Sequence, residues 1–106
     1  MPLMYHYTDR AGYNGIRATE DWYFKAAQPP ARGHPFGAYF TTLPRETPNL
    51  AQRLRIPLIK TGFFFAFSDA DDLAPLRGGR GKYVFYSPDD YRVVANRQQA
   101  SGDTKS

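Results

Sequence analysis

The chain has 106 residues, which is enough for one domain with one modest hydrophobic core. It contains no cysteine, which excludes disulfides, zinc–thiolate sites and a cysteine nucleophile, and its two histidines are too few for a histidine-only metal site. The net charge of +4 suits a dinucleotide, a nucleic acid or an acidic protein as partner, and the 16% of aromatic residues favours an aromatic core or a stacking surface.

The first third of the sequence predicts a strand, a helix and a second strand, followed by a loop with three prolines. Thr8 or Asp9 can cap the helix, which Gly12 and Gly15 weaken. The expected ranges are a strand over 3–7, a helix over 10–19, a strand over 22–26 and the loop over 28–35.

The remaining sequence predicts five further segments of regular structure. A continuous apolar run, Phe63–Phe67, indicates a strand that is covered on both faces. The expected ranges are strands over 38–41, 58–67, 82–86 and 91–95 and a short helix from Thr47 or Asn49 to about Leu54.

These elements predict an α+β domain over residues 1–95, with a mixed or antiparallel sheet that forms one layer or two facing layers. Residues 96–106 are polar, and we expect them to form a fraying C-terminal tail.

The sequence contains no apolar run as long as a membrane span and no signal peptide at its start. We therefore expect a cytoplasmic protein, of a producing or a target cell, with no membrane partner. The chain is expected to be either a short complete protein or a domain of a longer one.

Two short motifs carry a resemblance to a known family. His6-Tyr7-Thr8 ends the first strand before a helix with the pair Gly15-Ile16, and Gly37-Ala38-Tyr39-Phe40-Thr41 follows the pattern Gly-x-Tyr-Phe-Thr. Together with residues 81–89, they resemble in order and spacing the HYD1-type ADP-ribosyltransferase toxin domains of the H-Y-[E/D] group.

The resemblance implies an ADP-ribosyltransferase-like split-sheet fold with two short helices, which binds NAD as its substrate between two small sheets and needs no metal. His6 would hydrogen-bond the ribose beside the nicotinamide, Tyr39 would stack on the nicotinamide ring, and the backbone of Gly37 would approach the carboxamide. The full set of residues expected to contact NAD is His6, Tyr7, Thr8, Gly37, Ala38, Tyr39, Phe40 and Thr41.

The sequence departs from the family at the acidic residue. Relatives often have a glutamate at the position of Gly81 or Lys82, where this chain has no carboxylate. Asp89 and Asp90 in the following turn are the first candidates to stabilise the cationic sugar of the transition state. Further candidates follow the aromatic strand, namely Asp69, Asp71 and Asp72.

The resemblance implies a toxin or effector enzyme of the glycosyltransferase class that moves ADP-ribose from NAD to a protein, RNA or DNA acceptor, with a cognate immunity protein as a further partner. Two alternatives stay open, a degenerate transferase fold that binds NAD or ADP-ribose without turnover and a nucleic-acid-binding module. The residues themselves also allow a plainer interpretation, in which His6 is a core histidine and Tyr39-Phe40 pack in the core.

Overall fold

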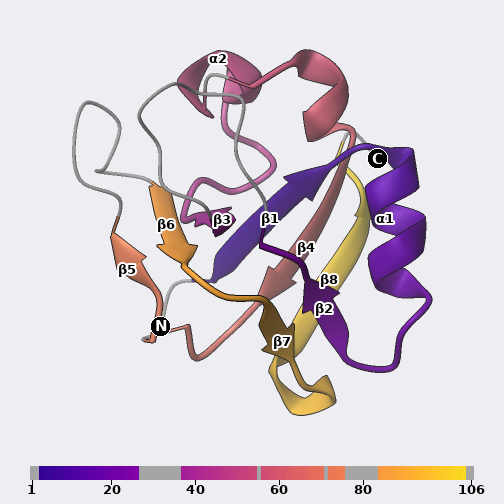
Figure 1. The fold of residues 1–106 in the computed structure, drawn as a ribbon. Helices are drawn as coiled ribbons and strands as arrows, with labels where there is room; N and C mark the ends of the chain where they lie inside the picture. The colour runs from indigo at the N-terminus through magenta and orange to yellow at the C-terminus, as the bar shows by residue number, and fades with distance from the viewer. Residues whose placement is uncertain (1–2, 27–36, 55, 71, 76–83, 105–106) are drawn as a thin grey trace.

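Two antiparallel sheets of unequal size dominate the fold (Figure 1). The computed structural model describes residues 3–26, 37–54, 56–70, 72–75 and 84–104. The larger sheet has the strand order β5-β6-β3-β1-β4-β8, and the smaller one pairs β2 with β7. The strands are β1 (Met4–Thr8), β2 (Trp22–Phe24), β3 (Ala38–Thr41), β4 (Phe63–Phe67), β5 (Ala74–Pro75), β6 (Val84–Ser87), β7 (Tyr91–Val93) and β8 (Gln98–Asp103).

Four short helical segments complete the described elements. They are the α-helices α1 (Arg10–Arg17) and α2 (Leu50–Leu54) and the 3₁₀-helices η1 (Leu58–Thr61) and η2 (Ala95–Arg97). Short helices combined with antiparallel sheets make this an α+β domain, which confirms the expected class. Among the described residues, no helix is long and apolar enough to cross a membrane.

The register of β1 decides which side chains face the smaller sheet. β1 pairs with β4 so that His6 lies opposite Phe65, and with β3 so that Tyr5 lies opposite Thr41. Because side chains alternate along a strand, Met4 and His6 share the inner face, toward β2 and β7, while Tyr5 points to the outer face.

The main core lies between the two sheets and is largely aromatic. Phe24 from the smaller sheet meets Phe40 from the larger one edge to face, with ring centroids 5.2 Å apart. Phe65 and Phe67 are 0% exposed in this layer, while Phe64 packs in a second cluster on the outer face. The prediction that residues 63–67 form a strand covered on both faces is therefore confirmed.

The helix α1 begins where the sequence predicts it. The carboxylate of Asp9 accepts a hydrogen bond from the backbone N–H of Gly12 (2.9 Å). It also forms an ion pair with Lys60 Nζ (2.7 Å). A Cβ on Gly12 would lie 2.0 Å from Thr8 Oγ1, so this glycine permits the close approach of α1 to β1. The helix ends at Arg17, two residues before the predicted end.

The C-terminal part differs from the expected polar tail. Residues 98–103 form β8, which pairs with β4 along the edge of the larger sheet. The Gln98 amide also donates hydrogen bonds to the carbonyl oxygens of Glu20 and Val93 (3.1 and 3.0 Å). Backbone pairing to β4 holds this strand, so its polar side chains can stay exposed, and composition alone does not reveal it.

Other boundaries shift for local reasons. Residues 58–61, expected at the start of a strand, form η1 after Pro57, and β4 begins only at Phe63. β2 ends at Phe24 and β7 at Val93, each two residues earlier than predicted.

Candidate functional site

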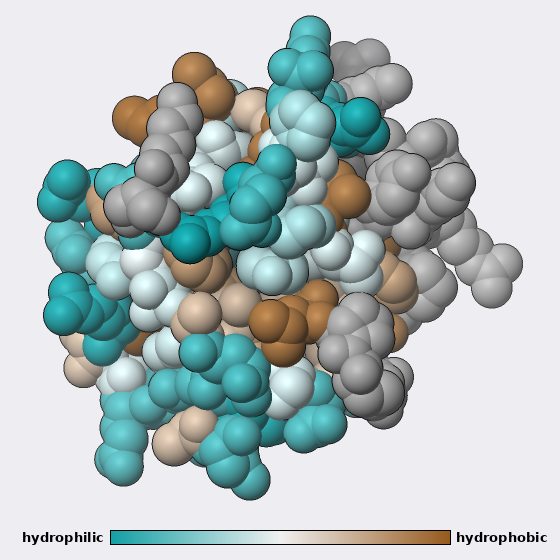
Figure 2. Space-filling view, turned by 180° about the vertical axis from the view of Figure 1, so that it is seen from behind, coloured by the Kyte–Doolittle hydropathy of each residue, from teal (hydrophilic) through white to brown (hydrophobic). Residues whose placement is uncertain are grey.

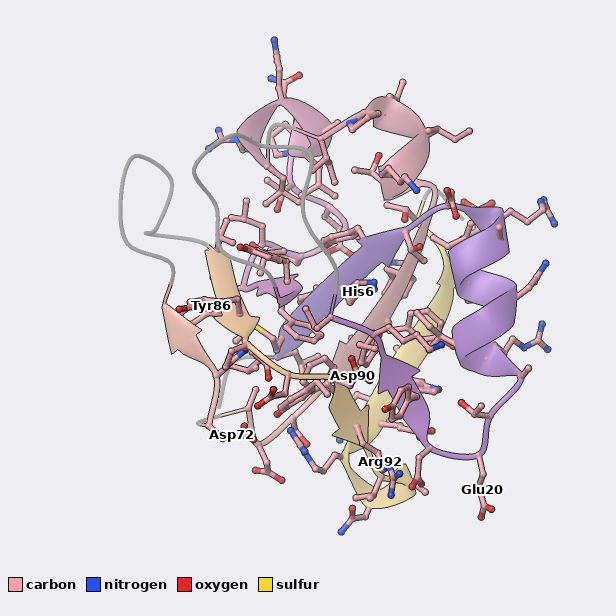
Figure 3. All side chains as sticks on the ribbon, in the orientation of Figure 1. His6, Glu20, Asp72, Tyr86, Asp90 and Arg92 are labelled. Atoms are coloured by element: carbon pink, nitrogen blue, oxygen red, sulfur yellow. The ribbon has the colours of Figure 1, made fainter. Side chains whose placement is uncertain are left out.

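His6 lies on the inner face of β1, between the two sheets (Figure 3). Its ring packs against Phe24 and Phe40, with centroid distances of 4.7 and 5.5 Å. Its Nδ1 lies 3.0 Å from the carbonyl oxygen of Tyr39. Because a carbonyl oxygen can only accept, Nδ1 carries the proton and donates it, which leaves Nε2 with a free lone pair in the neutral ring.

Burial holds this imidazole neutral. Desolvation lowers the pKa of His6 to about 4, and the hydrogen bond to the Tyr39 carbonyl opposes that shift only in part. The residue is not fully enclosed, since part of it stays accessible to solvent. In this tautomer, Nε2 of the neutral ring is a hydrogen-bond acceptor, for example for a hydroxyl group.

The side chain of Tyr39 lies on the opposite face of the sheet. The pairing of Tyr5 with Thr41 puts Tyr39 on the outer face and Phe40 on the inner one. The Tyr39 ring stacks on Tyr86, with centroids 5.8 Å apart and an interplanar angle of 22°. Burial raises the pKa of its hydroxyl. The structure thus brings His6 to the Tyr39 backbone but not to the Tyr39 ring.

The other residues of the two motifs make close internal contacts. The Tyr7 hydroxyl donates to the Leu43 carbonyl (2.7 Å), and Thr41 Oγ1 accepts from the Leu43 N–H (3.1 Å). A Cβ on Gly37 would lie 2.5 Å from the Ser87 carbonyl oxygen, so this glycine allows β3 and β6 to approach each other. Three further members of the expected NAD set are buried, namely Thr8, Ala38 and Phe40.

Asp90 stands at the edge of the smaller sheet, immediately before β7 (Figure 3). Its carboxylate accepts hydrogen bonds from the Tyr23 hydroxyl (2.7 Å) and the Ala26 N–H (2.8 Å), and the Tyr23 bond is the main reason why its pKa lies below the ordinary value. The next residue, Tyr91, pairs with Phe24, whose ring contacts His6. Asp90 is therefore an ionised, exposed carboxylate held by Tyr23, and both side chains lie on the side of the smaller sheet that faces away from the core, whereas Tyr91 faces the core.

The other acidic candidates have different surroundings. Asp89 is exposed in a turn, where its backbone carbonyl accepts from Ser87 Oγ (2.9 Å). Asp72 accepts from the Tyr91 hydroxyl (2.7 Å), and Asp69 is an exposed residue with a positive φ of 58°. Asp71, Gly81 and Lys82 lie outside the described residues.

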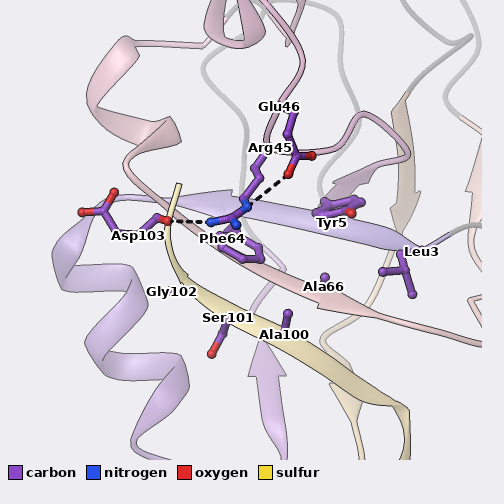
Figure 4. A pocket seen from close by; sticks show the side chains of 10 residues that line it. All are labelled: Leu3, Tyr5, Arg45, Glu46, Phe64, Ala66, Ala100, Ser101, Gly102 and Asp103. Carbon is purple, nitrogen blue, oxygen red and sulfur yellow. Dashed lines mark hydrogen bonds and ion pairs between the residues drawn. The ribbon is translucent and has the colours of Figure 1, made fainter. Parts of the chain in front are cut away.

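A pocket of about 300 Å³ on the outer face was not predicted from the sequence (Figure 4). Phe64 lines it beneath Arg45, whose guanidinium lies 5.2 Å from the ring centroid and 3.3 Å from the Glu46 carboxylate. Tyr5 and Gly102 also border it. Because His6 points to the inner face, this pocket is separate from the surroundings of His6.

Among the described residues, no group of three or more histidine, cysteine or acidic side chains is placed to hold a metal ion. The chain has no significant match among protein-family models, curated proteins or solved structures.

Proposed function

We propose that this chain is an NAD-dependent ADP-ribosyltransferase domain with a split-sheet fold of the HYD1 type, which transfers ADP-ribose to a macromolecular acceptor. The observation that carries the proposal is the place of His6 between the two sheets, where its Nδ1 lies 3.0 Å from the Tyr39 carbonyl oxygen and the second ring nitrogen is left to bind a ligand. The motif resemblance around His6 and Tyr39 supports the same assignment.

In the proposed reaction, the bond between the nicotinamide nitrogen and the ribose C1′ breaks, and nicotinamide leaves with the bonding electrons. The sugar then resembles an oxocarbenium ion, and a nucleophile of the acceptor forms the new bond to C1′ and loses its proton. His6 Nε2 would accept a hydrogen bond from a ribose hydroxyl and orient the sugar. The resemblance gives Asp90 the role of favouring the developing positive charge, although Tyr23 holds its carboxylate on the side of the smaller sheet that faces away from His6.

The position of His6 fits a bound ribose, whereas the positions of the Asp90 carboxylate and the Tyr39 ring fit less well. A ligand held by His6 on the inner face lies on the other side of the sheet from this ring. We therefore assign Tyr39 the role of positioning His6 through its backbone carbonyl, in place of the stacking role that the resemblance implies.

The test is nicotinamide release from NAD by the wild type and by His6→Asn. The asparagine amide can still donate to the Tyr39 carbonyl, but it lacks the acceptor at Nε2, so we expect a loss of about 100-fold or more in the rate of release. Gln52→Ala, an exposed position on α2, is the matched control and should change nothing. Circular dichroism establishes that each variant is folded. Equal release by wild type and His6→Asn would refute the role given to His6.

One observation favours a second candidate, a fold of this type that binds NAD or ADP-ribose without turnover. The Asp90 carboxylate already accepts two hydrogen bonds within the protein, which hold it at the smaller sheet. Titration calorimetry with NAD distinguishes the two candidates. Binding that His6→Asn weakens, with no nicotinamide release by the wild type, would favour the binding module.

A further inference from the structure

Two aliphatic side chains on η1 are unusually open to solvent. Leu58 and Ile59 are 68% and 70% exposed, whereas the next large exposed hydrophobic residue, Val94, is 42% exposed. Figure 2 shows strongly hydrophobic side chains projecting at the upper left, over the corner that η1 occupies. Single exposed apolar residues are common, but two neighbours at one protruding corner form an apolar tip.

The backbone holds this tip in place. The Lys60 N–H donates to the Pro57 carbonyl (2.9 Å), and Thr61 Oγ1 donates to the Leu58 carbonyl (2.7 Å). The Lys60 ammonium pairs with Asp9 at 2.7 Å and so ties η1 to the start of α1. The backbone that carries the aliphatic pair is therefore held in place, so little backbone entropy remains to be lost when the pair is buried.

The borders of the tip are basic. Arg53 is exposed on α2, which packs against η1, and Arg10 is exposed at the start of α1. Arg10 lies over the ring of Phe63, which follows η1 by two residues, with its guanidinium 5.2 Å from the ring centroid. Two acidic residues of the described chain lie near this corner, namely Asp9, whose charge is paired with that of Lys60, and Asp103, which lies opposite Phe63.

We propose that Leu58 and Ile59 insert into an anionic membrane surface, with Arg53 and Arg10 on the lipid headgroups. Aliphatic side chains flanked by arginine are the composition of interfacial membrane contacts. Insertion of the tip into a pocket of a partner protein is less favoured. The residues that contribute most to binding at protein interfaces are tryptophan, tyrosine and arginine, whereas leucine is under-represented among them. This proposal revises the expectation of no membrane partner and does not depend on the activity toward NAD.

The experiment is co-sedimentation of the protein with phosphatidylcholine vesicles, either pure or containing about 30% phosphatidylserine. We expect the wild type to bind the anionic vesicles, and the double variant Leu58→Ser/Ile59→Ser to bind about ten-fold more weakly or worse. Arg53→Gln should weaken binding about five-fold, which is the value of one basic residue at such a surface. Raising the salt to about 0.5 M should weaken it further.

Val94→Ser is the matched control, since it removes an exposed aliphatic side chain elsewhere and should bind like the wild type. Because all the substituted side chains are exposed, the variants should keep the wild-type circular dichroism and thermal midpoint. No binding of the wild type to either vesicle would overturn the proposal. The apolar tip would then be expected to bind a pocket on a partner protein. Equal binding to neutral vesicles, or an equal loss for Val94→Ser, would also overturn it.

Discussion

His6 should make the stability of this protein depend on pH in a window where few other side chains titrate. The unfolded chain binds a proton at His6 with an ordinary pKa of 6.5, whereas burial lowers the pKa in the folded state to about 4. Between these values the unfolded state holds more protons, so the free energy of unfolding falls as the pH drops from about 6.5 toward 4.

The magnitude follows from the difference between the two pKa values. The whole window is worth about 3.4 kcal/mol, because each pKa unit corresponds to about 1.36 kcal/mol. From pH 7 to pH 5 the linkage relation gives a loss of about 2 kcal/mol from His6 alone. This is a large part of the total stability expected for a domain of this size.

Urea denaturation at several pH values between 7 and 5, for wild type and His6→Asn, isolates this contribution. The variant loses the packing of the imidazole against Phe24 and Phe40, so its stability is lower at every pH. It has no titrating group at position 6, and all other groups are common to both proteins. The difference between the two free energies should therefore shrink by about 2 kcal/mol toward pH 5. A difference that stays constant over this range would refute the conclusion that the folded protein keeps His6 neutral.

Four further substitutions test the packing and the electrostatics of the fold. Gly12→Ala puts a Cβ 2.0 Å from the hydroxyl of the threonine that ends β1, so it should lower the free energy of unfolding in urea by about 1–3 kcal/mol. Gly15→Ala on the same helix meets nothing within 4 Å, so it should raise the free energy of unfolding by about 0.5–1 kcal/mol. Similar effects of the two changes would contradict the close packing of α1 on β1. Phe65→Ala should cost about 3–5 kcal/mol, because the ring is fully buried between the sheets, and a loss below about 1 kcal/mol would place that ring elsewhere. Tyr23→Phe removes the hydroxyl that bonds Asp90, so an NMR titration should show the pKa of that carboxyl rising toward its ordinary value; an unchanged pKa would mean that the bond is absent in solution.

Much of the local structure follows from short-range features of the sequence. The aromatic run over residues 63–67 has no polar position, so it suits a strand with both faces covered. Residues 38–41 form a strand with the predicted bounds. The cap at Asp9 is a local hydrogen bond to a residue three positions later.

The arrangement of the candidate site depends instead on contacts between distant residues. The hydrogen bond from Tyr23 to Asp90 joins residues that are 67 positions apart in the sequence. No local sequence pattern around either residue predicts this contact. The outer-face pocket likewise forms where the segment around Arg45 lies over β4 and β8. β8 is missed because backbone pairing stabilises it, while its side chains look like those of a tail.

The position of Tyr39 shows how the register of one strand decides the chemistry of the site. A slip of β3 by one residue would bring the Tyr39 ring to the inner face beside His6, but it would also turn Phe40 out of the core. Phe40 is 2% exposed and contacts Phe24, Phe67 and Tyr91, so the observed register is strongly favoured. In the proposed reaction, Tyr39→Leu should therefore retain most of the nicotinamide release, because the backbone carbonyl that orients His6 remains. If Tyr39→Leu instead abolishes release as fully as His6→Asn, with both proteins folded, the ring must reach the substrate and β3 must adopt another register when NAD binds.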